Sequence, residues 1–213
     1  VPDLPDHIPQ RGNRRQPVFF GEADYRTYLE LLRAQSHRWG LEVWVDCLMT
    51  NHVHLLVVPA GDQSLARGVG ETHRRYTRHV NFREGWRGDL WQGRFASVPL
   101  DESHLTAAFR YVEHNPVAAG LVHHAEDYPW SSARAPVTGS HDPLLSPHPL
   151  LDTMRDWRTF LRTAEDPTMT RHLEQQLRTG RPQGTVTFLD QLEAQLGRPV
   201  RRRCSGPQPA AVQ

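Results

Sequence analysis

The chain has 213 residues, a length that suits one core domain with an appendage or two small domains. Hydrophobic residues make up 38% of it, enough for a packed core, so the composition excludes a wholly disordered protein. The formal net charge is only +1, so the chain lacks the globally basic signature of many nucleic-acid-binding proteins.

The N-terminal part begins with a short strand pattern and a long helix pattern. Residues 7–12 (HIPQRG) predict a strand, although Pro9 cannot donate a hydrogen bond to a sheet ladder. Residues 13–16 predict a polar, basic turn. Apolar side chains near helical spacing then predict a helix over residues 22–39, which Gly40 ends.

A hairpin and a second helix are expected next. Residues 41–49 and 52–58 are rich in β-branched and aromatic side chains, which favours two strands joined by a tight turn. Ser64 is the expected N-cap of a helix that ends near Arg83. A loop containing Gly and Trp follows over residues 86–93.

The last predicted elements of the core are a strand over residues 95–100 and a helix. Asp101 or Ser103 caps this helix, which runs through about His114 and ends near Pro116. The order is then strand, helix, strand, strand, helix, strand, helix. It predicts an α+β fold of the ferredoxin-like split βαβ type, with one antiparallel sheet, helices on one face, and one extra helix at the end.

After Trp130 the patterns weaken. We expect a loop, a connecting helix, two short amphipathic helices and a basic, disordered tail, over residues 136–149, 154–163, 170–178, 188–196 and 198–213 in turn. The chain therefore divides into a core domain, a loop with its connecting helix, and a small helical extension with its tail, over residues 1–135, 136–163 and 164–213.

The two cysteines, Cys47 and Cys204, lie far apart and form neither a CxxC zinc pattern nor a disulfide framework. This usage fits a reducing cytoplasm. No run approaches the roughly 20 apolar residues that span a bilayer, and no signal peptide is visible. We therefore expect a cytoplasmic protein without a membrane partner.

Two histidines are the first candidates for chemistry. His52 and His54 stand two apart on a predicted strand, so both imidazoles project from one face, while Val53 points the other way into the core. Two imidazoles on one face form half a metal site. Taken alone, this spacing is a weak signal, and a structural or accidental interpretation is favoured.

A second pair lies on the last predicted helix of the core. Tyr111 and Asn115 are four residues apart, so a phenol and an amide oxygen share one face. Without the histidines, a core tyrosine and a C-terminal cap would be favoured. With them, a mechanism is available, because a phenol is a weak nucleophile that needs a cation on the phosphate it attacks.

Arginine supplies all 25 basic residues, and no lysine occurs. Codon bias in a GC-rich genome explains the absence of lysine, but it does not explain the clusters near residues 11–15, 74–78 and 201–203. The guanidinium group matches pairs of phosphate oxygens. His73 and Arg83 could join a backbone-binding groove, with a solvated helix face as an equal alternative. Trp86 and Trp91 could stack on bases, with core packing favoured for at least one of them.

Several runs together resemble the HUH single-tyrosine transposases, and within them the REP-associated tyrosine transposases. The match covers roughly residues 7–135, with the motifs in the family's order. The runs are RGNRRQPVFF (11–20), LMTNHVHLLVVP (48–59), RRYTRHVNFREGWRGDLWQGRF (74–95), RYVEHNPVAAGLV (110–122) and DYPWSSA (127–133). Several dispersed motifs in register are far more specific than the two histidines alone.

This resemblance implies that His52 and His54 form the HUH motif, that Tyr111 is the nucleophile and that Asn115 is the third metal ligand. It also implies cleavage and rejoining of single-stranded DNA through a 5′-phosphotyrosine, with Mg²⁺ or Mn²⁺ as cofactor. The REP-associated branch is linked to hairpin-forming palindromic repeats. The chain departs from the family at Ala118, where Arg is usual, and at Pro9, where a β-former is usual.

The expected function is thus a transposase-like DNA strand transferase whose partner is single-stranded DNA with a hairpin. The alternatives are a non-catalytic module that binds DNA or RNA hairpins and a phosphodiesterase that uses water. We expect Mn²⁺ rather than Mg²⁺ as the preferred ion, because imidazole nitrogen suits manganese better and magnesium prefers oxygen ligands. Whether the protein acts as a monomer or a homodimer stays open. The expected DNA contacts are Arg11, Asn13, Arg14, Arg15, Arg74, Arg75, Arg78 and Arg94.

Overall fold

The structure is a computed structural model that describes residues 1–163, 166–182 and 184–201. Its centre is a four-stranded antiparallel sheet with the strand order β2-β3-β1-β4. This order is that of the ferredoxin-like split βαβ fold, so the predicted fold class is confirmed. The strands are β1 (Asp6–Arg11), β2 (Leu41–Met49), β3 (His52–Pro59) and β4 (Val98–Pro99).

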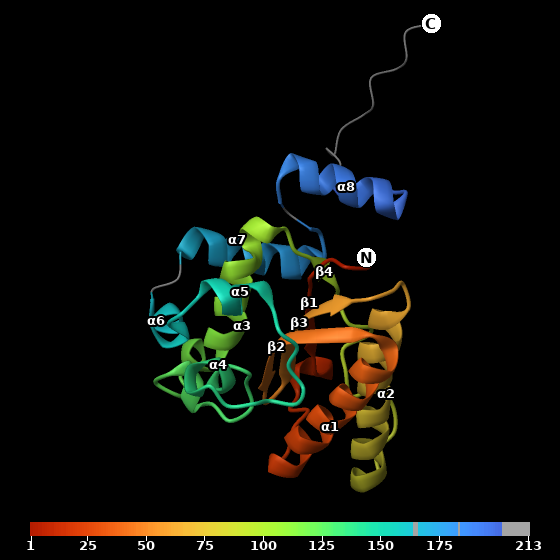
Figure 1. The fold of residues 1–213 in the computed structure, drawn as a ribbon. Helices are drawn as coiled ribbons and strands as arrows, with labels where there is room; N and C mark the ends of the chain where they lie inside the picture. The colour runs from red at the N-terminus through yellow and green to blue at the C-terminus, as the bar shows by residue number, and fades with distance from the viewer. Residues whose placement is uncertain (164–165, 183, 202–213) are drawn as a thin grey trace, which may run out of the picture.

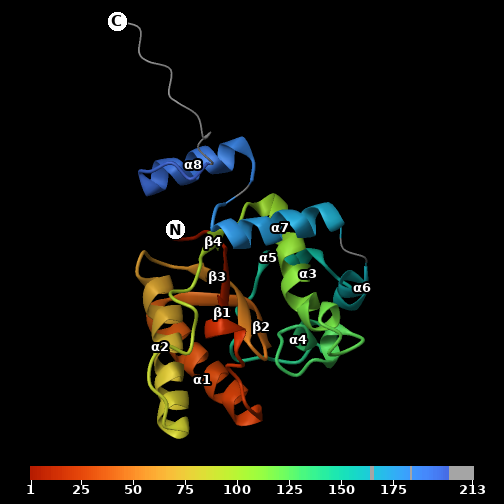
Figure 2. The same ribbon diagram turned by 180° about the vertical axis from the view of Figure 1, so that it is seen from behind.

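The two faces of the sheet carry different helices (Figures 1 and 2). Helices α1 (Glu22–Trp39) and α2 (Ser64–Glu84) cover one face, whereas α3 (Glu102–Ala118), the predicted extra helix, covers the other. Side chains alternate along β3, so Val53 and Leu55 face α1 and α2 while Leu56 faces α3.

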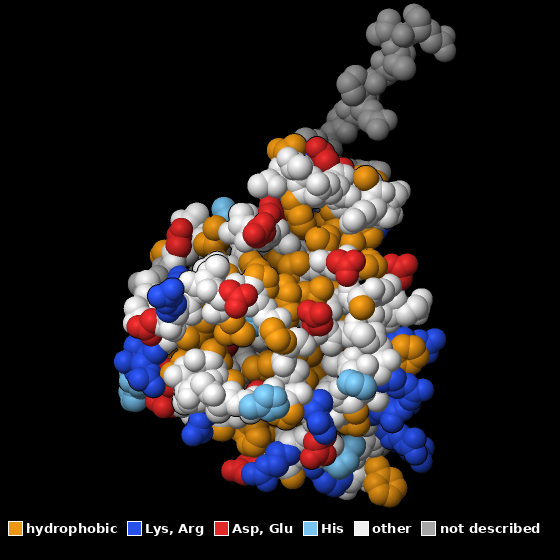
Figure 3. Space-filling view, in the orientation of Figure 1, with side chains coloured by type: hydrophobic (Ala, Val, Ile, Leu, Met, Phe, Trp, Pro, Cys, Tyr) orange, Lys and Arg blue, Asp and Glu red, His pale blue; other side chains and the backbone are white. Residues whose placement is uncertain are grey.

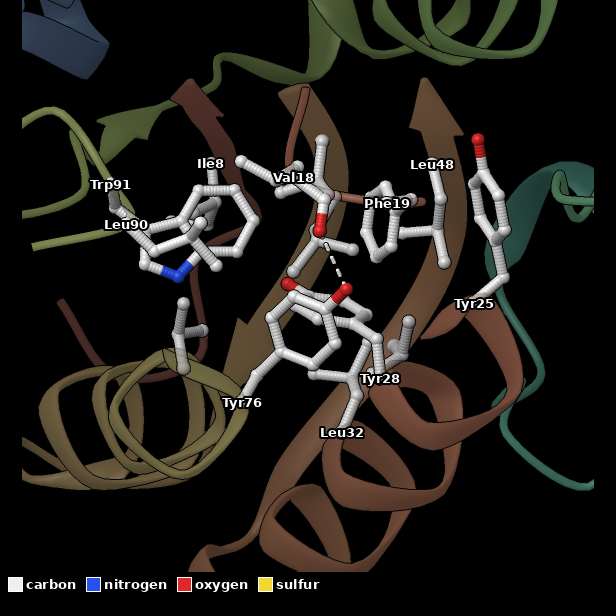
Figure 4. Close-up of a cluster of buried hydrophobic side chains, with 14 of the residues drawn as sticks. Ile8, Val18, Phe19, Tyr25, Tyr28, Leu32, Leu48, Tyr76, Leu90 and Trp91 are labelled. Atoms are coloured by element: carbon white, nitrogen blue, oxygen red, sulfur yellow. Dashed lines mark hydrogen bonds between the residues drawn. The ribbon is translucent and has the colours of Figure 1, made fainter. Parts of the chain in front are cut away.

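The core between the sheet and α1 and α2 is aromatic (Figure 4). Tyr28 and Tyr76 are fully buried, and Phe19 stacks at 4.3 Å on Tyr25. The Tyr76 hydroxyl donates a 2.6 Å hydrogen bond to the carbonyl of Val18. A buried phenol costs free energy unless it is hydrogen-bonded, so this bond ties α2 to the segment before α1.

Helix α1 begins and ends where the sequence predicts. Gly40 follows it with φ 60°, a left-handed conformation that glycine adopts without strain. Helix α2 differs in one detail. Ser64 is its first residue rather than its cap, and the Ser64 hydroxyl accepts a hydrogen bond from the Gly61 N–H.

The prediction of a strand over residues 95–100 is wrong in its length, because the strand is shorter. Only Val98 and Pro99 are paired, with His7 and Asp6 of β1. Pro99 has no N–H to extend the ladder. The short β4 leaves the middle of β1 without a paired strand on that side, and only at its end does the Gln92 N–H donate to the carbonyl of Arg11. Pro9 lies in this stretch, opposite His54, and a sheet edge is where proline is tolerated.

Helix α3 also runs further than predicted. Asp101 caps it, and its side chain accepts a hydrogen bond from the Ser103 N–H. The helix continues past Pro116 to Ala118, because a proline in the last turn removes one backbone hydrogen bond without preventing the others. The Ala119 N–H still donates to the carbonyl of Asn115.

The C-terminal part is more helical than expected. Helix α4 (Arg134–Thr138) takes up part of the predicted loop, and the predicted connecting helix begins later, at Trp157, after a separate short helix that ends at Thr153. The two amphipathic helices are confirmed, and α8 packs on Val1 and Leu4. The predicted tail lies outside the described residues from residue 202 on. The remaining elements are α5 (Pro149–Thr153), α6 (Trp157–Arg162), α7 (Pro167–Thr179), α8 (Val186–Leu196) and the 3-10 turns η1 (Asn13–Arg15) and η2 (Ala125–Asp127).

In the part of the chain that the structure describes, no helix combines the length and the apolar character that crossing a membrane requires.

Candidate active site

The side chains of His52 and His54 lie on the face of β3 that α3 covers. Their ring centroids are 5.1 Å apart, and their planes are nearly perpendicular. Val53 between them is fully buried on the opposite face. The strand alternation therefore holds both imidazoles at the contact between the sheet and α3.

Tyr111 reaches this contact from α3. Its ring centroid lies 5.7 Å from that of His54, in an edge-to-face arrangement. Asn115 follows one turn later, where its amide N–H donates a 3.0 Å hydrogen bond to the carbonyl of Tyr111. Its side chain also lies within hydrogen-bonding reach of His52. The four predicted residues thus meet at one place, although they come from two distant segments.

They line a common pocket of about 710 Å³, which we call the histidine pocket. Arg11 and Arg15 from the N-terminal segment line it with Arg94 from the loop before β4. The other side of the pocket is formed by α7 of the C-terminal extension, through Glu174, Leu177 and Arg178. The sequence patterns did not assign this helix to the site.

The hydrogen bonds of Asn51 fix the tautomer of His52. The Asn51 amide N–H donates to the carbonyl of Arg15 at 3.1 Å, so its oxygen faces His52 Nδ1, 2.6 Å away. An amide oxygen only accepts, so Nδ1 of His52 must carry the proton and donate it. The lone pair of His52 is therefore on Nε2, where it can bind a cation.

His54 is oriented in the same way by a residue that the sequence analysis missed. Nε2 of His7 lies 2.9 Å from Nδ1 of His54, and both rings are buried. When Nδ1 of His54 donates to His7, the Nε2 of His54 is free to act as a ligand. A histidine in the first predicted strand was the available signal, but its meaning depends on the pairing of β1 with β3.

The electrostatics keep both candidate ligands neutral. Burial, and then the charge of Arg11, lower the pKa of His52 to about 4, although the Asn115 hydrogen bond opposes them. Burial, followed by the charges of His7, His52 and Arg11, lowers the pKa of His54 well below its ordinary value. Neutral imidazole is the form that binds a metal.

The donor set fits a divalent cation. It offers two imidazole nitrogens whose other ring nitrogens are already engaged, together with one amide oxygen. It is not a cluster of three His, Cys, Asp or Glu side chains, and the described residues contain no such cluster arranged for a metal. A set without carboxylates leaves the charge of the cation uncompensated, which suits an anionic phosphate ligand.

The expected DNA contacts divide into groups. Arg14 and Arg15 have φ values of 53° and 60°, unusual for residues other than glycine, and such strain often marks functional positions. Asn13 belongs to the same 3-10 turn. Arg74 and Arg78, by contrast, lie along α2 outside the histidine pocket, and Arg75 is paired with Glu71 at 3.5 Å.

Two other candidates for a DNA groove are engaged by partners within the protein, although His73 also lines a pocket between α2 and the loop before β4. His73 is only 6% exposed, and its Nε2 is hydrogen-bonded at 2.9 Å to the hydroxyl of Tyr28. Arg83 is held by Asp24 in a salt bridge, which anchors α2 to α1. Of the two tryptophans, Trp91 is buried in the core, as favoured for one of them, and Trp86 is 45% exposed.

A buried carboxyl group fixes the rotation of α3. The side chain of Glu113 accepts hydrogen bonds from Ser132 Oγ at 3.0 Å and from Trp157 Nε1 at 2.8 Å. Burial raises the pKa of Glu113 from its ordinary 4.5 to about 7, although these bonds oppose the shift. Because the folded state keeps this proton longer than the unfolded state, the contribution of Glu113 to stability is present below about pH 4.5 and is lost as the pH rises toward 7.

The variant Glu113→Gln should remove this pH dependence. From about pH 5 to about pH 8, the unfolding free energy of the wild type should fall by about 2 to 3 kcal/mol relative to that of the variant. Urea unfolding at several pH values measures the difference. Glu102→Gln, at an exposed position of the same helix, is the control. A difference between wild type and Glu113→Gln that is independent of pH would contradict the assignment.

Comparisons with protein families and with solved structures find proteins that are similar to this chain. The family model described as "Transposase IS200 like" matches residues 2–115. The fold is similar to that of a REP-associated tyrosine transposase solved with a REP hairpin, with a TM-score of 0.55 and 18% identity over 70% of this chain and 88% of that one. A transposase candidate from Deinococcus radiodurans R1 aligns with a TM-score of 0.39 and 24% identity over 54% of this chain and 92% of that one. No curated protein matches the chain.

Proposed function

The chain belongs to the family of IS200-like transposases, and on this premise we propose that it cuts and rejoins single-stranded DNA with Tyr111 as nucleophile. The observation that carries the proposal is the meeting of Tyr111, His52, His54 and Asn115 in one pocket. These four residues supply three kinds of functional group that such a reaction needs: a phenol, two neutral imidazoles and an amide.

The proposed step is a phosphoryl transfer. The hydroxyl oxygen of Tyr111 attacks the phosphorus of a DNA phosphodiester and loses its proton to solvent. The bond from phosphorus to the 3′ oxygen breaks, and that oxygen takes up a proton. The products are a 5′-phosphotyrosine on one DNA end and a free 3′-hydroxyl on the other. Attack by another 3′-hydroxyl on the phosphotyrosine reverses the chemistry and joins two strands, so no ATP is needed.

The family is typically metal-dependent, and His52, His54 and Asn115 would hold the ion here. A divalent cation at these residues would neutralise charge on the phosphate and make its phosphorus more electrophilic. The protein's own part is to keep both imidazoles neutral and correctly turned, through Asn51 and His7. We propose Mn²⁺ before Mg²⁺, because nitrogen ligands suit manganese better.

We further propose that the substrate carries a hairpin-forming repeat. The similar REP-associated transposase was solved with a REP hairpin, and Arg11 and Arg15 at the pocket offer guanidinium groups for a DNA backbone. We also propose that the catalytic core ends near residue 135 and that the loop, connecting helix and helical extension over residues 136–213 are an appendage, although α7 of that appendage lines the pocket.

The test uses a labelled single-stranded oligonucleotide with an inverted repeat, taken from the DNA that flanks the gene. With Mn²⁺, the wild type should form a protein–DNA adduct that survives denaturation. EDTA should prevent it. Cleavage without an adduct would instead favour a phosphodiesterase that uses water. Hairpin binding that survives EDTA, with neither cleavage nor adduct, would favour a non-catalytic binding module.

His7 should act as a positioning residue for His54. His7→Ala should weaken Mn²⁺ binding by about 10- to 100-fold, which is typical for the loss of a hydrogen-bond partner of a metal ligand. His7→Gln, which keeps an acceptor, should restore part of the affinity. Isothermal titration with Mn²⁺ measures both, and thermal unfolding shows whether each variant is folded. A folded His7→Ala protein with the wild-type Mn²⁺ affinity would exclude this role.

A further inference from the structure

The histidine pocket is the first of three neighbouring pockets. The second, of about 860 Å³, lies between α2 and the loop before β4, and its lining includes Arg74, Thr77 and Arg94. The third, of about 560 Å³, lies at the C-terminal end of α2 and includes Arg78 and Phe82. We call the second and third pockets the middle pocket and the end pocket.

Shared lining residues join the three pockets into one groove. Arg94 lines both the histidine pocket and the middle pocket. Arg74 and Thr77 line both the middle pocket and the end pocket. Between Gly70 and Phe82 the groove follows α2 for about 18 Å, at about 1.5 Å of helix rise per residue. This length matches about five stacked nucleotides at about 3.4 Å each.

The groove carries an excess of positive charge, because its lining holds more arginines than carboxylates, which are Asp89 and Glu174. Arg78, Arg87 and Arg94 have no salt bridge within the part of the chain that the structure describes. Arg74 differs, because Glu71 binds it at 2.7 Å. In Figure 3, arginine side chains, coloured blue, gather along the edge of the molecule where α2 lies in Figure 1. Unpaired guanidinium groups in a row fit the phosphates of a nucleic acid.

Two aromatic side chains at the end pocket are exposed to solvent. Phe82 is 91% exposed and Trp86 is 45% exposed. The Trp86 ring stands edge-on to that of Phe20 at 5.6 Å, and its backbone N–H donates to the carbonyl of Asn81 at 2.9 Å. Trp86 is therefore held in place while part of its surface stays open. Aromatic surfaces beside cations are the usual platform for the bases of a single strand.

We propose that this groove binds an unpaired DNA strand that flanks the hairpin and leads into the histidine pocket. The free arginines contact its phosphates, and Trp86 and Phe82 stack on its bases. An unpaired strand fits better than a duplex, because a duplex hides the faces of its bases and would leave the aromatic side chains without a role. The proposal rests on the proposed function in one respect: it takes the histidine pocket as the place of cleavage.

The test measures binding in EDTA, where no metal-dependent cleavage occurs. Two fluorescent probes share one hairpin from the DNA that flanks the gene. One is blunt, and the other carries single-stranded oligothymidine on both sides. Phe82→Ala and Trp86→Ala should each weaken binding of the flanked probe by about 5- to 150-fold, as expected for one lost stacking contact. The blunt probe should bind with unchanged affinity.

The charge arm uses the double variant Arg78→Glu/Arg87→Glu. For the flanked probe it should lower the slope of log affinity against log salt concentration by about 2. Two matched controls lie away from the groove, where Arg134 on α4 is an exposed arginine and Leu121 is 51% exposed. Arg134→Glu and Leu121→Ala should leave the affinity for both probes unchanged.

The proposal would be overturned if the groove variants bound the flanked probe with unchanged affinity. It would also be overturned if they lost the same affinity for both probes, because that result would indicate contact with the duplex. A loss with Arg134→Glu as large as that with the double variant would overturn it too. Adduct formation by the wild type on the flanked probe with Mn²⁺ separates the two proposals. If the wild type forms an adduct but the groove variants bind the flanked probe as tightly as the wild type, only the groove proposal is rejected. If the groove variants weaken binding of the flanked probe but the wild type forms no adduct, only the cleavage mechanism is rejected.

Discussion

Tyr111→Phe should lower the rate of covalent adduct formation by at least about a thousandfold, because it removes the proposed nucleophile. The change removes only one oxygen. The ring that packs 5.7 Å from His54 and 5.9 Å from His7 stays in place, so folding and hairpin binding should persist. Denaturing gels of a labelled hairpin oligonucleotide with Mn²⁺ measure the adduct.

Tyr25→Phe is the matched control for this experiment. Tyr25 is also largely buried, but it stacks on Phe19 and Trp130 at the other face of the sheet. Tyr25→Phe also removes one hydroxyl group, and it should leave the rate of adduct formation within a few-fold of that of the wild type. An adduct that still forms on the Tyr111→Phe protein would mean that another residue is the nucleophile.

His54→Ala should have the second-largest effect. The side chain is 5% exposed and its Nδ1 is engaged by His7, so it offers one fixed nitrogen to the cation. Losing a direct ligand should weaken Mn²⁺ binding more than losing its hydrogen-bond partner does, by more than about 100-fold. Isothermal titration with Mn²⁺ measures the affinity, and the adduct rate should fall in parallel.

His123→Ala serves as the control, because His123 is exposed and lies after the end of α3. It should keep both the Mn²⁺ affinity and the adduct rate. If the His54→Ala protein is folded and binds Mn²⁺ as tightly as the wild type, the metal is held elsewhere and the proposed ligand set is wrong.

The elements with strong local patterns could be predicted from the sequence. Helix α1 and strand β2 have the predicted bounds, because their side-chain periodicity and the stop at Gly40 are properties of neighbouring residues. Strand β4 could not be predicted in this way. Its length depends on how far β1 continues to pair with it, and that is decided by tertiary contacts and by Pro99.

The candidate site required more than local patterns. Tyr111 and His54 meet because Leu105, Phe109 and Val112 pack α3 on the face of the sheet that carries Leu56. No spacing in the sequence fixes that contact, so the resemblance to a family supplied it. Neither local patterns nor the family resemblance predicted the role of His7. This role follows from the register of β1 on β3, and His7 belongs to none of the motifs that carry the resemblance.

The most direct measurement is a peptide map of the adduct. The wild type is trapped on the flanked hairpin with Mn²⁺, the DNA is trimmed with nucleases, and the protein is digested and analysed by mass spectrometry. We predict a nucleotide linked through its 5′ phosphate to the peptide that contains Tyr111. A nucleotide on any other residue, or a 3′ linkage, would contradict the proposed mechanism, and cleavage with no linked peptide at all would contradict covalent catalysis by this protein.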